Sequence, residues 1–310
     1  MKIQLSCLGF ITLSVISGCT KNYSNAPAQY TDLQSALSKA ATKVTTVSFD
    51  AGSGSSFADS SGTRYIIPPN AFATNNGQVV TGKVTVSAIS FLKRSDVLFS
   101  KALTVSNGQP LASAGEFYFK VTQNGADLKI ADGQMYSVKM PQTGPCDTSM
   151  QLYFGTLLDT NVNKTSIVNW QPASGTSMGF ITNPAPDTTV VTTNQTGYVN
   201  SDQPLPKKLP KGIYQSFTLR LTSVDGMSNI VSAYAIYDSV NVVWPMLNVK
   251  DGYVTEDHVL NVPCRFVVFA IIKGNFYAAV TKQVPMTGII YGVDVARTTP
   301  SALKALIDNY

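Results

Sequence analysis

The 310 residues of this chain include a single histidine, His258, so catalysis that depends on histidine has one candidate residue. A Ser-His-Asp arrangement would have to use that residue, and we expect the stretch Thr255–His258 to be a solvated turn. A zinc site needs three or four histidine, cysteine or carboxylate ligands, and neither Cys-x-x-Cys nor His-x-x-x-His spacing occurs. We therefore predict no catalytic residue, no metal site and no cofactor.

Carboxylates are the other candidates for catalysis. Only two of the 18 acidic residues are glutamates, Glu116 and Glu256. Glycoside hydrolysis needs two carboxyl groups, one of them with a raised pKa. Glu116 falls on the face of its strand opposite Phe117 and Phe119, where a cross-strand partner of opposite charge would account for it. A pair of aspartates that meet only in the folded chain stays open as the basis of an envelope hydrolase.

Two of the four cysteines, Cys146 and Cys264, allow two interpretations. In an oxidising compartment they are candidates for a disulfide, which would join the middle strands to the last part of the chain. Spacing alone does not establish the geometry that a disulfide requires, so two buried thiols are the alternative.

Aromatic side chains are the candidates for ligand binding. Trp170 and Trp244 are the residues that we single out for stacking on sugar rings. Packing inside a core is the competing interpretation. Tyr234 and Ile236 share one face of a predicted strand and Tyr237 lies on the other, as in a strand covered on both sides.

The N-terminus has the pattern of an export signal. Lys2 precedes an apolar segment, Ile3–Ile16, which is too short to span a bilayer and fits a signal peptide. Ile16-Ser17-Gly18-Cys19 resembles the lipobox of bacterial lipoproteins. The resemblance implies cleavage after Gly18 and acylation of Cys19. Thr20, where inner-membrane lipoproteins usually carry aspartate, favours the outer membrane and leaves its periplasmic or surface face undecided.

Composition points to a folded, strand-rich chain. Charged residues make up 13% of it, against roughly 25% in an average domain, and hydrophobic residues make up 44%. The net charge of +5 comes from scattered basic residues, which argues against nucleic-acid binding. Thr31-Asp32-Leu33-Gln34 predicts a capping box and a short helix near 31–42. Thr299-Pro300 predicts the start of a short terminal helix.

In residues 44–141, runs in which apolar and polar residues alternate predict strands, and Asn-Gly and Asp-Gly turns separate these runs. The segment Ser61–Phe72, with Pro68-Pro69-Asn70-Ala71-Phe72, followed by Gly77 and the strand Val79–Val86, resembles the ZU5 domain and its bacterial envelope relatives. The resemblance implies a small β domain for protein–protein contact. Some ZU5 domains cleave themselves at His-Phe-Ser, which is missing because His258 is followed by Val259.

We therefore predict a mainly β protein with two small β-sandwich-like domains and short helices at each end. The expected divisions are a signal peptide (1–18), a lipid-anchored tether with a helix (19–43), a ZU5-like domain (44–141), further strands and a Pro/Thr/Asn-rich linker (142–211, the linker from 171), and a C-terminal β domain (212–310).

The predicted function is that of a non-catalytic, lipid-anchored interaction protein of the bacterial cell envelope. Its expected partners are the outer membrane, through the lipid on Cys19, and another envelope protein. A glycan-binding lipoprotein is the alternative, and it depends on the aromatic side chains.

Overall fold

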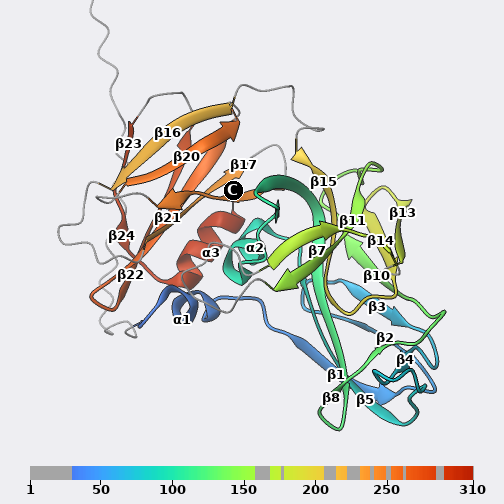
Figure 1. Cartoon of the computed structure of the whole chain (residues 1–310). Helices are drawn as coiled ribbons and strands as arrows, with labels where there is room; N and C mark the ends of the chain where they lie inside the picture. The colour runs from blue at the N-terminus through green and yellow to red at the C-terminus, as the bar shows by residue number, and fades with distance from the viewer. Residues whose placement is uncertain are drawn as a thin grey trace, which may run out of the picture.

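The computed structural model describes residues 30–157, 168–175, 178–205, 214–221, 231–237, 241–248, 253–260, 263–283 and 290–309. These residues form two β-sandwiches, here called the N-terminal lobe (45–205) and the C-terminal lobe (described parts of 214–297). Three short helices lie between the lobes (Figure 1). The mainly β fold class that we predicted is confirmed.

The larger sheet of the N-terminal lobe has the order β1-β5-β7-β15-β11-β12, and β6 and β8 also pair with β7. Its pairs are antiparallel, and β7 is the longest strand. The strands span Thr45–Asp50 (β1), Lys83–Phe91 (β5), Val105–Ser106 (β6), Gln109–Gln123 (β7), Ala126–Asp127 (β8), Gln151–Leu157 (β11), Val168–Pro172 (β12) and Gly197–Pro204 (β15).

A second sheet of the N-terminal lobe, in the order β13-β14-β10-β3-β2, covers one face of the first. Its strands span Ser55–Ala58 (β2), Arg64–Ile67 (β3), Tyr136–Pro141 (β10), Gly179–Ala185 (β13) and Thr188–Thr193 (β14), and a small pair joins Phe72–Ala73 (β4) to Lys129–Ile130 (β9). Phe117, Phe119 and Val121 of β7 share the core between the sheets, as their alternation predicts.

The C-terminal lobe repeats this two-sheet arrangement. One sheet has the order β18-β17-β21-β22-β24 and the other β19-β20-β16-β23, in which β16 and β23 are parallel. The strands span Tyr214–Leu221 (β16), Val231–Tyr237 (β17), Val243–Pro245 (β18), Leu247–Asn248 (β19), Tyr253–Leu260 (β20), Cys264–Ile272 (β21), Asn275–Gln283 (β22), Ile290–Val293 (β23) and Ala296–Arg297 (β24). Val267 and Phe269 of β21 face the helices, whereas Phe266 and Val268 face the second sheet.

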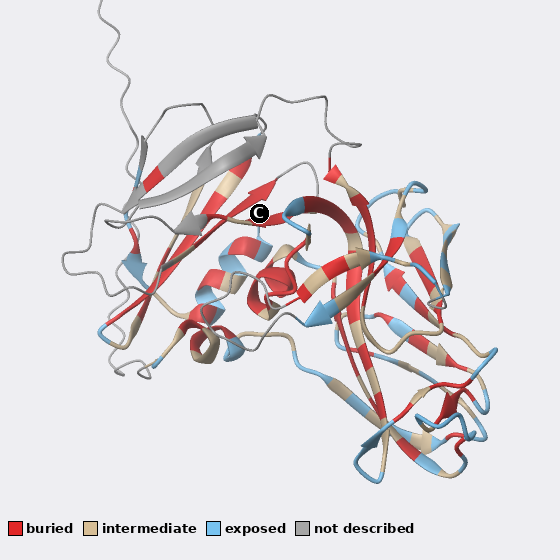
Figure 2. Cartoon of the chain, viewed as in Figure 1, coloured by how far each residue is buried: buried red, intermediate tan, exposed pale blue. Residues whose placement is uncertain are grey.

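The helices join the two lobes through one apolar core. They span Leu33–Ser38 (α1), Arg94–Ser100 (α2) and Pro300–Asp308 (α3). Their buried side chains pack with Trp170 from the N-terminal lobe and Phe269 from the C-terminal lobe. Figure 2 shows the buried residues running through the helices into strands of both lobes. Because this core is continuous, the lobes form one packed body.

Both predicted helices are present. Asp32 caps α1, because its carboxylate accepts a hydrogen bond from the Ser35 N–H at 2.7 Å, so the cap lies one residue later than expected. Thr299 caps α3, with Pro300 at the first helical position. Helix α2 was not predicted, because the buried polar residues Ser95 and Asp96 interrupt its apolar pattern.

The prediction of a linker over 171–211 was wrong. Strands β13, β14 and β15 lie in that stretch, and β15 pairs with β7 and β11 inside the large sheet. Thr188–Thr193 is rich in β-branched residues, which suit a strand despite their polarity. The predicted signal peptide and the tether up to residue 29 lie outside the described residues.

Candidate functional site

A cleft of about 770 Å³ opens where the two lobes and the helices meet. Asp96 from α2 and Lys304 and Asp308 from α3 lie along it, and Ser113 and Ala114 of β7 form part of its wall. Gln142 and Asn241 bring side-chain amides from the two lobes. The volume falls within the range of about 300–1,000 Å³ that is typical of ligand sites.

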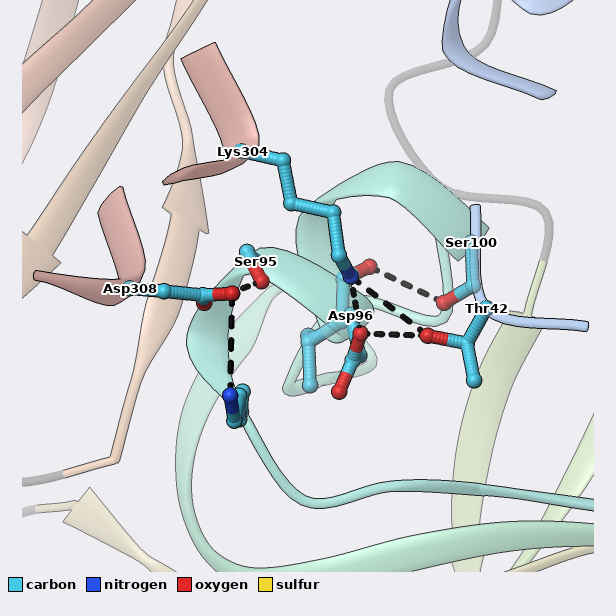
Figure 3. Close-up of polar contacts among 8 residues, drawn as sticks. Thr42, Ser95, Asp96, Ser100, Lys304 and Asp308 are labelled. Atoms are coloured by element: carbon cyan, nitrogen blue, oxygen red, sulfur yellow. Dashed lines mark hydrogen bonds and ion pairs between the residues drawn. The ribbon is translucent and has the colours of Figure 1, made fainter. Parts of the chain in front are cut away.

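The floor of the cleft holds a largely buried ion pair. Lys304 donates to the carboxylate of Asp96, which also accepts a hydrogen bond from the Thr42 hydroxyl (Figure 3). The side chain of Asp96 is 6% exposed and that of Lys304 is 21% exposed. Asp96 and Lys304 are 208 residues apart in sequence, so this contact joins the first half of the chain to its last helix. A buried ion pair is stable only when the fold holds the two charged groups close together, as it does here.

A second ion pair joins the same two helices at the surface. Asp308 accepts a hydrogen bond from Ser95 and lies 3.8 Å from the Lys93 ammonium. The Lys93 side chain is 67% exposed, so water screens this pair. The two ion pairs lie between the same two helices and differ mainly in burial. Substitutions in the two pairs can therefore be compared to measure how burial affects their contribution to stability.

We expect Asp96→Ala to lower the free energy of unfolding by about 2–3 kcal/mol, because it leaves the Lys304 ammonium in a mostly buried position without its carboxylate. The value lies below that of a fully buried pair because Lys304 keeps some contact with water. Lys93→Ala should cost less than about 1 kcal/mol. Urea unfolding measures both losses of unfolding free energy. Equal losses would contradict the expectation that the more buried ion pair contributes more to stability.

The wall of the cleft contains a β-bulge. Glu116 pairs with Asn200 and Ser113 pairs with Asp202, so that Ala114 and Gly115 of β7 stand opposite Ser201 of β15. Gly115 has φ of 132°, and a Cβ there would lie 3.1 Å from Leu92 and Met140 atoms. Only glycine fits this backbone without strain. The extra residue places Ser113 and Glu116, three positions apart, on the same face.

Four polar side chains meet at this bulge and are nearly or wholly removed from water. The Ser113 hydroxyl accepts from the Gly115 N–H at 3.0 Å and donates to Asn200 Oδ1 at 2.8 Å. Asn200 Nδ2 donates to Asp202 Oδ2 at 2.6 Å. Glu116 and Asp202 have no exposed surface. Both carboxylate oxygens of Glu116 and Oδ1 of Asp202 lack a hydrogen-bond partner among the described residues.

Burial dominates the electrostatics of this pair. Desolvation, and then the charge of Asp202, raise the pKa of Glu116 well above its usual range, and the nearby Asn200 amide offsets part of that rise. Desolvation likewise raises the pKa of Asp202, with the Ser113 hydroxyl acting in the opposite sense. Such groups bind protons more tightly in the folded chain, so their contribution to stability falls as pH rises above the ordinary carboxyl range.

A hydrolase needs carboxyl groups that reach a substrate. Glu116 and Asp202 converge, as the open hydrolase hypothesis requires, yet neither has any accessible surface. Glycosidases also pair a protonated acid with an ionised carboxylate, whereas burial favours the neutral form of both groups here. The pair therefore does not form an open acid–base site in this structure.

The prediction that an opposite charge accounts for Glu116 was wrong. Its neighbour is a second acid, and no cation appears among the groups that shift its pKa in the described part of the chain. Asp202 was missed because it lies in the predicted linker. A run of polar residues, Asn200–Gln203, gives no sign in sequence that it is buried.

The two tryptophans do not form an exposed sugar platform. Trp170 is fully buried, and its indole N–H donates to the Leu103 carbonyl oxygen at 2.9 Å. Trp244 is 9% exposed and packs in the core of the C-terminal lobe. Stacking needs an accessible ring face. The glycan alternative therefore loses the residues on which it depended, and Tyr234 and Tyr237 are likewise core residues.

No disulfide joins Cys146 and Cys264 in this structure. Cys146 lies near the hairpin between β13 and β14, where its thiol is 3.7 Å from the Ala185 carbonyl oxygen and accepts from Thr189. Cys264 is buried in the C-terminal lobe, in the core between its two sheets. The thiols belong to separate lobes, which favours the alternative of two unbridged cysteines. Cys19 lies outside the described residues.

One residue and one short motif bear on serine-hydrolase catalysis. His258 belongs to β20 rather than to the turn that we expected. The chain also contains the Gly-x-Ser-x-Gly spacing of a hydrolase nucleophile motif at Gly175–Gly179, and its serine, Ser177, lies outside the described residues. A nucleophile elbow leads from a strand into a helix, whereas the last glycine of this motif, Gly179, begins strand β13. The motif therefore lacks the structural setting of an elbow.

Within the described ranges, no three histidine, cysteine or acidic side chains gather where they could hold a metal ion. None of the helices described is long and apolar enough to cross a membrane. Comparisons with known proteins found no matching family model, no similar curated protein and no similar solved structure.

Proposed function

We propose that this chain is a lipid-anchored, non-catalytic interaction protein of the bacterial cell envelope, and that its partner binds in the cleft between the lobes. The cleft is the observation that carries the proposal. It is formed by segments far apart in sequence, among them residue 42, the start of α2, residues 141–143 and the end of α3. Binding there would depend on the complete fold rather than on one lobe.

The lining of the cleft suits a polypeptide partner. It combines charged residues of both signs with hydroxyl and amide groups, and it includes the apolar Leu92 and Ile307. A peptide offers backbone donors and acceptors together with mixed side chains, so it complements such a surface. The ZU5-like stretch in the N-terminal lobe supports the same proposal, because that resemblance implies protein–protein contact.

The anchor would hold this cleft close to the membrane. Tyr30 donates its N–H to the Gly274 carbonyl oxygen at 2.8 Å, and its ring packs edge-on against Phe276. Eleven residue steps separate Cys19 from Tyr30, which span at most about 40 Å when fully extended. Lipid on Cys19 would therefore confine both lobes to a thin layer at one membrane face. Confinement raises the local concentration of the protein for a partner there.

Photo-cross-linking in intact cells tests the proposal. We expect a cross-linking residue at exposed cleft positions Ser60 or Thr143 to capture one protein in near-stoichiometric amount. The same residue at Asn76, an exposed turn position outside the cleft, should not capture it. Mass spectrometry identifies the adduct. Equal capture from all three positions, or from none, would rule out the cleft as the binding site.

A further inference from the structure

The bulge in β7 leaves three carboxylate oxygens without a donor. Among the nearby donors, the Gly115 N–H bonds Ser113, the Ser113 hydroxyl bonds Asn200, and one N–H of the Asn200 amide bonds Asp202 Oδ2. The Asn200 amide also lowers the pKa of Glu116. Within the described residues, Glu116 Oε1, Glu116 Oε2 and Asp202 Oδ1 have no hydrogen bond of ordinary geometry. Buried polar atoms without partners carry a large desolvation penalty, so such a group calls for an explanation.

Two kinds of positive species would satisfy these oxygens. A proton on each carboxyl group would neutralise the pair, and the raised pKa of both groups favours that form when no ion is bound. A divalent cation between the two groups would instead balance both negative charges while both stay ionised. In the described part of the chain, no cationic side chain is among the groups that shift the pKa of Glu116 or Asp202, so a divalent ion would match the charge of the pair.

We propose that Glu116 and Asp202 bind a divalent cation of the calcium class at the bulge between β7 and β15. The carboxylates supply three oxygen ligands, and Asn200 Oδ1 and Ser113 Oγ lie in the same hydrogen-bonded cluster as neutral oxygens. An all-oxygen donor set selects hard cations over zinc. Calcium tolerates irregular coordination, whereas magnesium demands near-octahedral geometry and retains water.

The ion would reach the cluster from the cleft, past Ser113. Ser113 contacts Asn200 on one side and lines the cleft on the other. Its backbone N–H donates to the Asn241 carbonyl oxygen at 3.1 Å, and Gln142 donates to the Ala114 carbonyl oxygen at 2.8 Å. The ion would thus tie together the cleft wall, to which both lobes contribute. The proposal stands independently of lipid anchoring and of the envelope partner.

Calcium titration of the full chain tests this site. After treatment with a chelator and dialysis, we expect isothermal titration with CaCl₂ to show one ion bound per chain. Calcium should also raise the midpoint of thermal unfolding. Tyr153 and Tyr198 lie close enough to feel the charges of Asp202 and Glu116, so excitation of tyrosine should sensitise the luminescence of bound Tb³⁺.

Glu116→Gln and Asp202→Asn should each weaken calcium binding by at least about tenfold. The matched control is Asp127→Asn, since Asp127 is a surface acid paired with Lys120 at 2.9 Å, and it should leave binding unchanged. If either variant fails to fold, the stoichiometry and Tb³⁺ signal of the unmodified chain still decide. Absence of binding at millimolar calcium, or binding unaffected by both variants, would overturn the proposal. The proposal would also be overturned if Glu116→Gln raised the free energy of unfolding by the same amount with and without calcium. That result would mean that protonation alone, without a metal ion, neutralises Glu116 and Asp202.

Discussion

Cys19→Ala is expected to release the protein from the membrane fraction without unfolding it. The proposed anchor attaches two or three acyl chains, each stabilising insertion by about 0.8 kcal/mol per buried methylene. One change removes the thiol that accepts the diacylglycerol, and with it the whole anchor. The described strands and helices of the two lobes all lie after residue 32, so the midpoint of thermal unfolding should match that of the unmodified protein.

The matched control is Cys146→Ala, which removes a thiol that lies near the β13–β14 hairpin of the N-terminal lobe. It should leave the protein in the membrane fraction. Cell fractionation followed by immunoblotting compares the two variants, and mass spectrometry of the N-terminal peptide reports acylation directly. A Cys19→Ala protein that stays with the membranes would contradict the lipobox interpretation, whatever the fate of the partner and calcium proposals.

Trp170→Ala should lower the free energy of unfolding by about 3–5 kcal/mol. Trp170 is fully buried on the edge strand β12, packs against Tyr198 and bonds the Leu103 carbonyl oxygen after α2. Truncation removes a large apolar surface, leaves a cavity and removes one of the two N–H donors to that carbonyl, which keeps its hydrogen bond from the Val105 N–H at 2.7 Å. With total stabilities of about 5–15 kcal/mol, the loss is a large fraction of the whole.

Urea unfolding monitored by far-UV circular dichroism measures this loss without relying on the tryptophan signal. Phe180→Ala is the control, since this aromatic on β13 is 52% exposed and should change stability by no more than about 0.5 kcal/mol. Trp170→Phe, which keeps an aromatic ring and loses the N–H, should fall between them. A Trp170→Ala loss below 1 kcal/mol would show that the helices do not join the lobes as described.

Sequence patterns were sufficient where the physics is local. The alternation of Phe117, Phe119 and Val121 identified a core face because successive side chains of a strand point to opposite sides. Thr299 and Pro300 identified the start of α3, because capping and a fixed φ act within one turn. The mainly β class followed from repeated strands and turns. The ZU5-like and lipobox resemblances also come from local motifs and remain predictions.

Tertiary structure decided what burial does to individual side chains. Trp170 reads equally well as a sugar platform or a core residue until its neighbours are known. Glu116 and Asp202 lie 86 residues apart, and Asp202 belongs to a polar stretch with no apolar alternation. Strand pairing and one bulge bring them together, and desolvation then governs both carboxyls. Sequence determines which groups are available, whereas long-range pairing determines which of them meet and whether water reaches them.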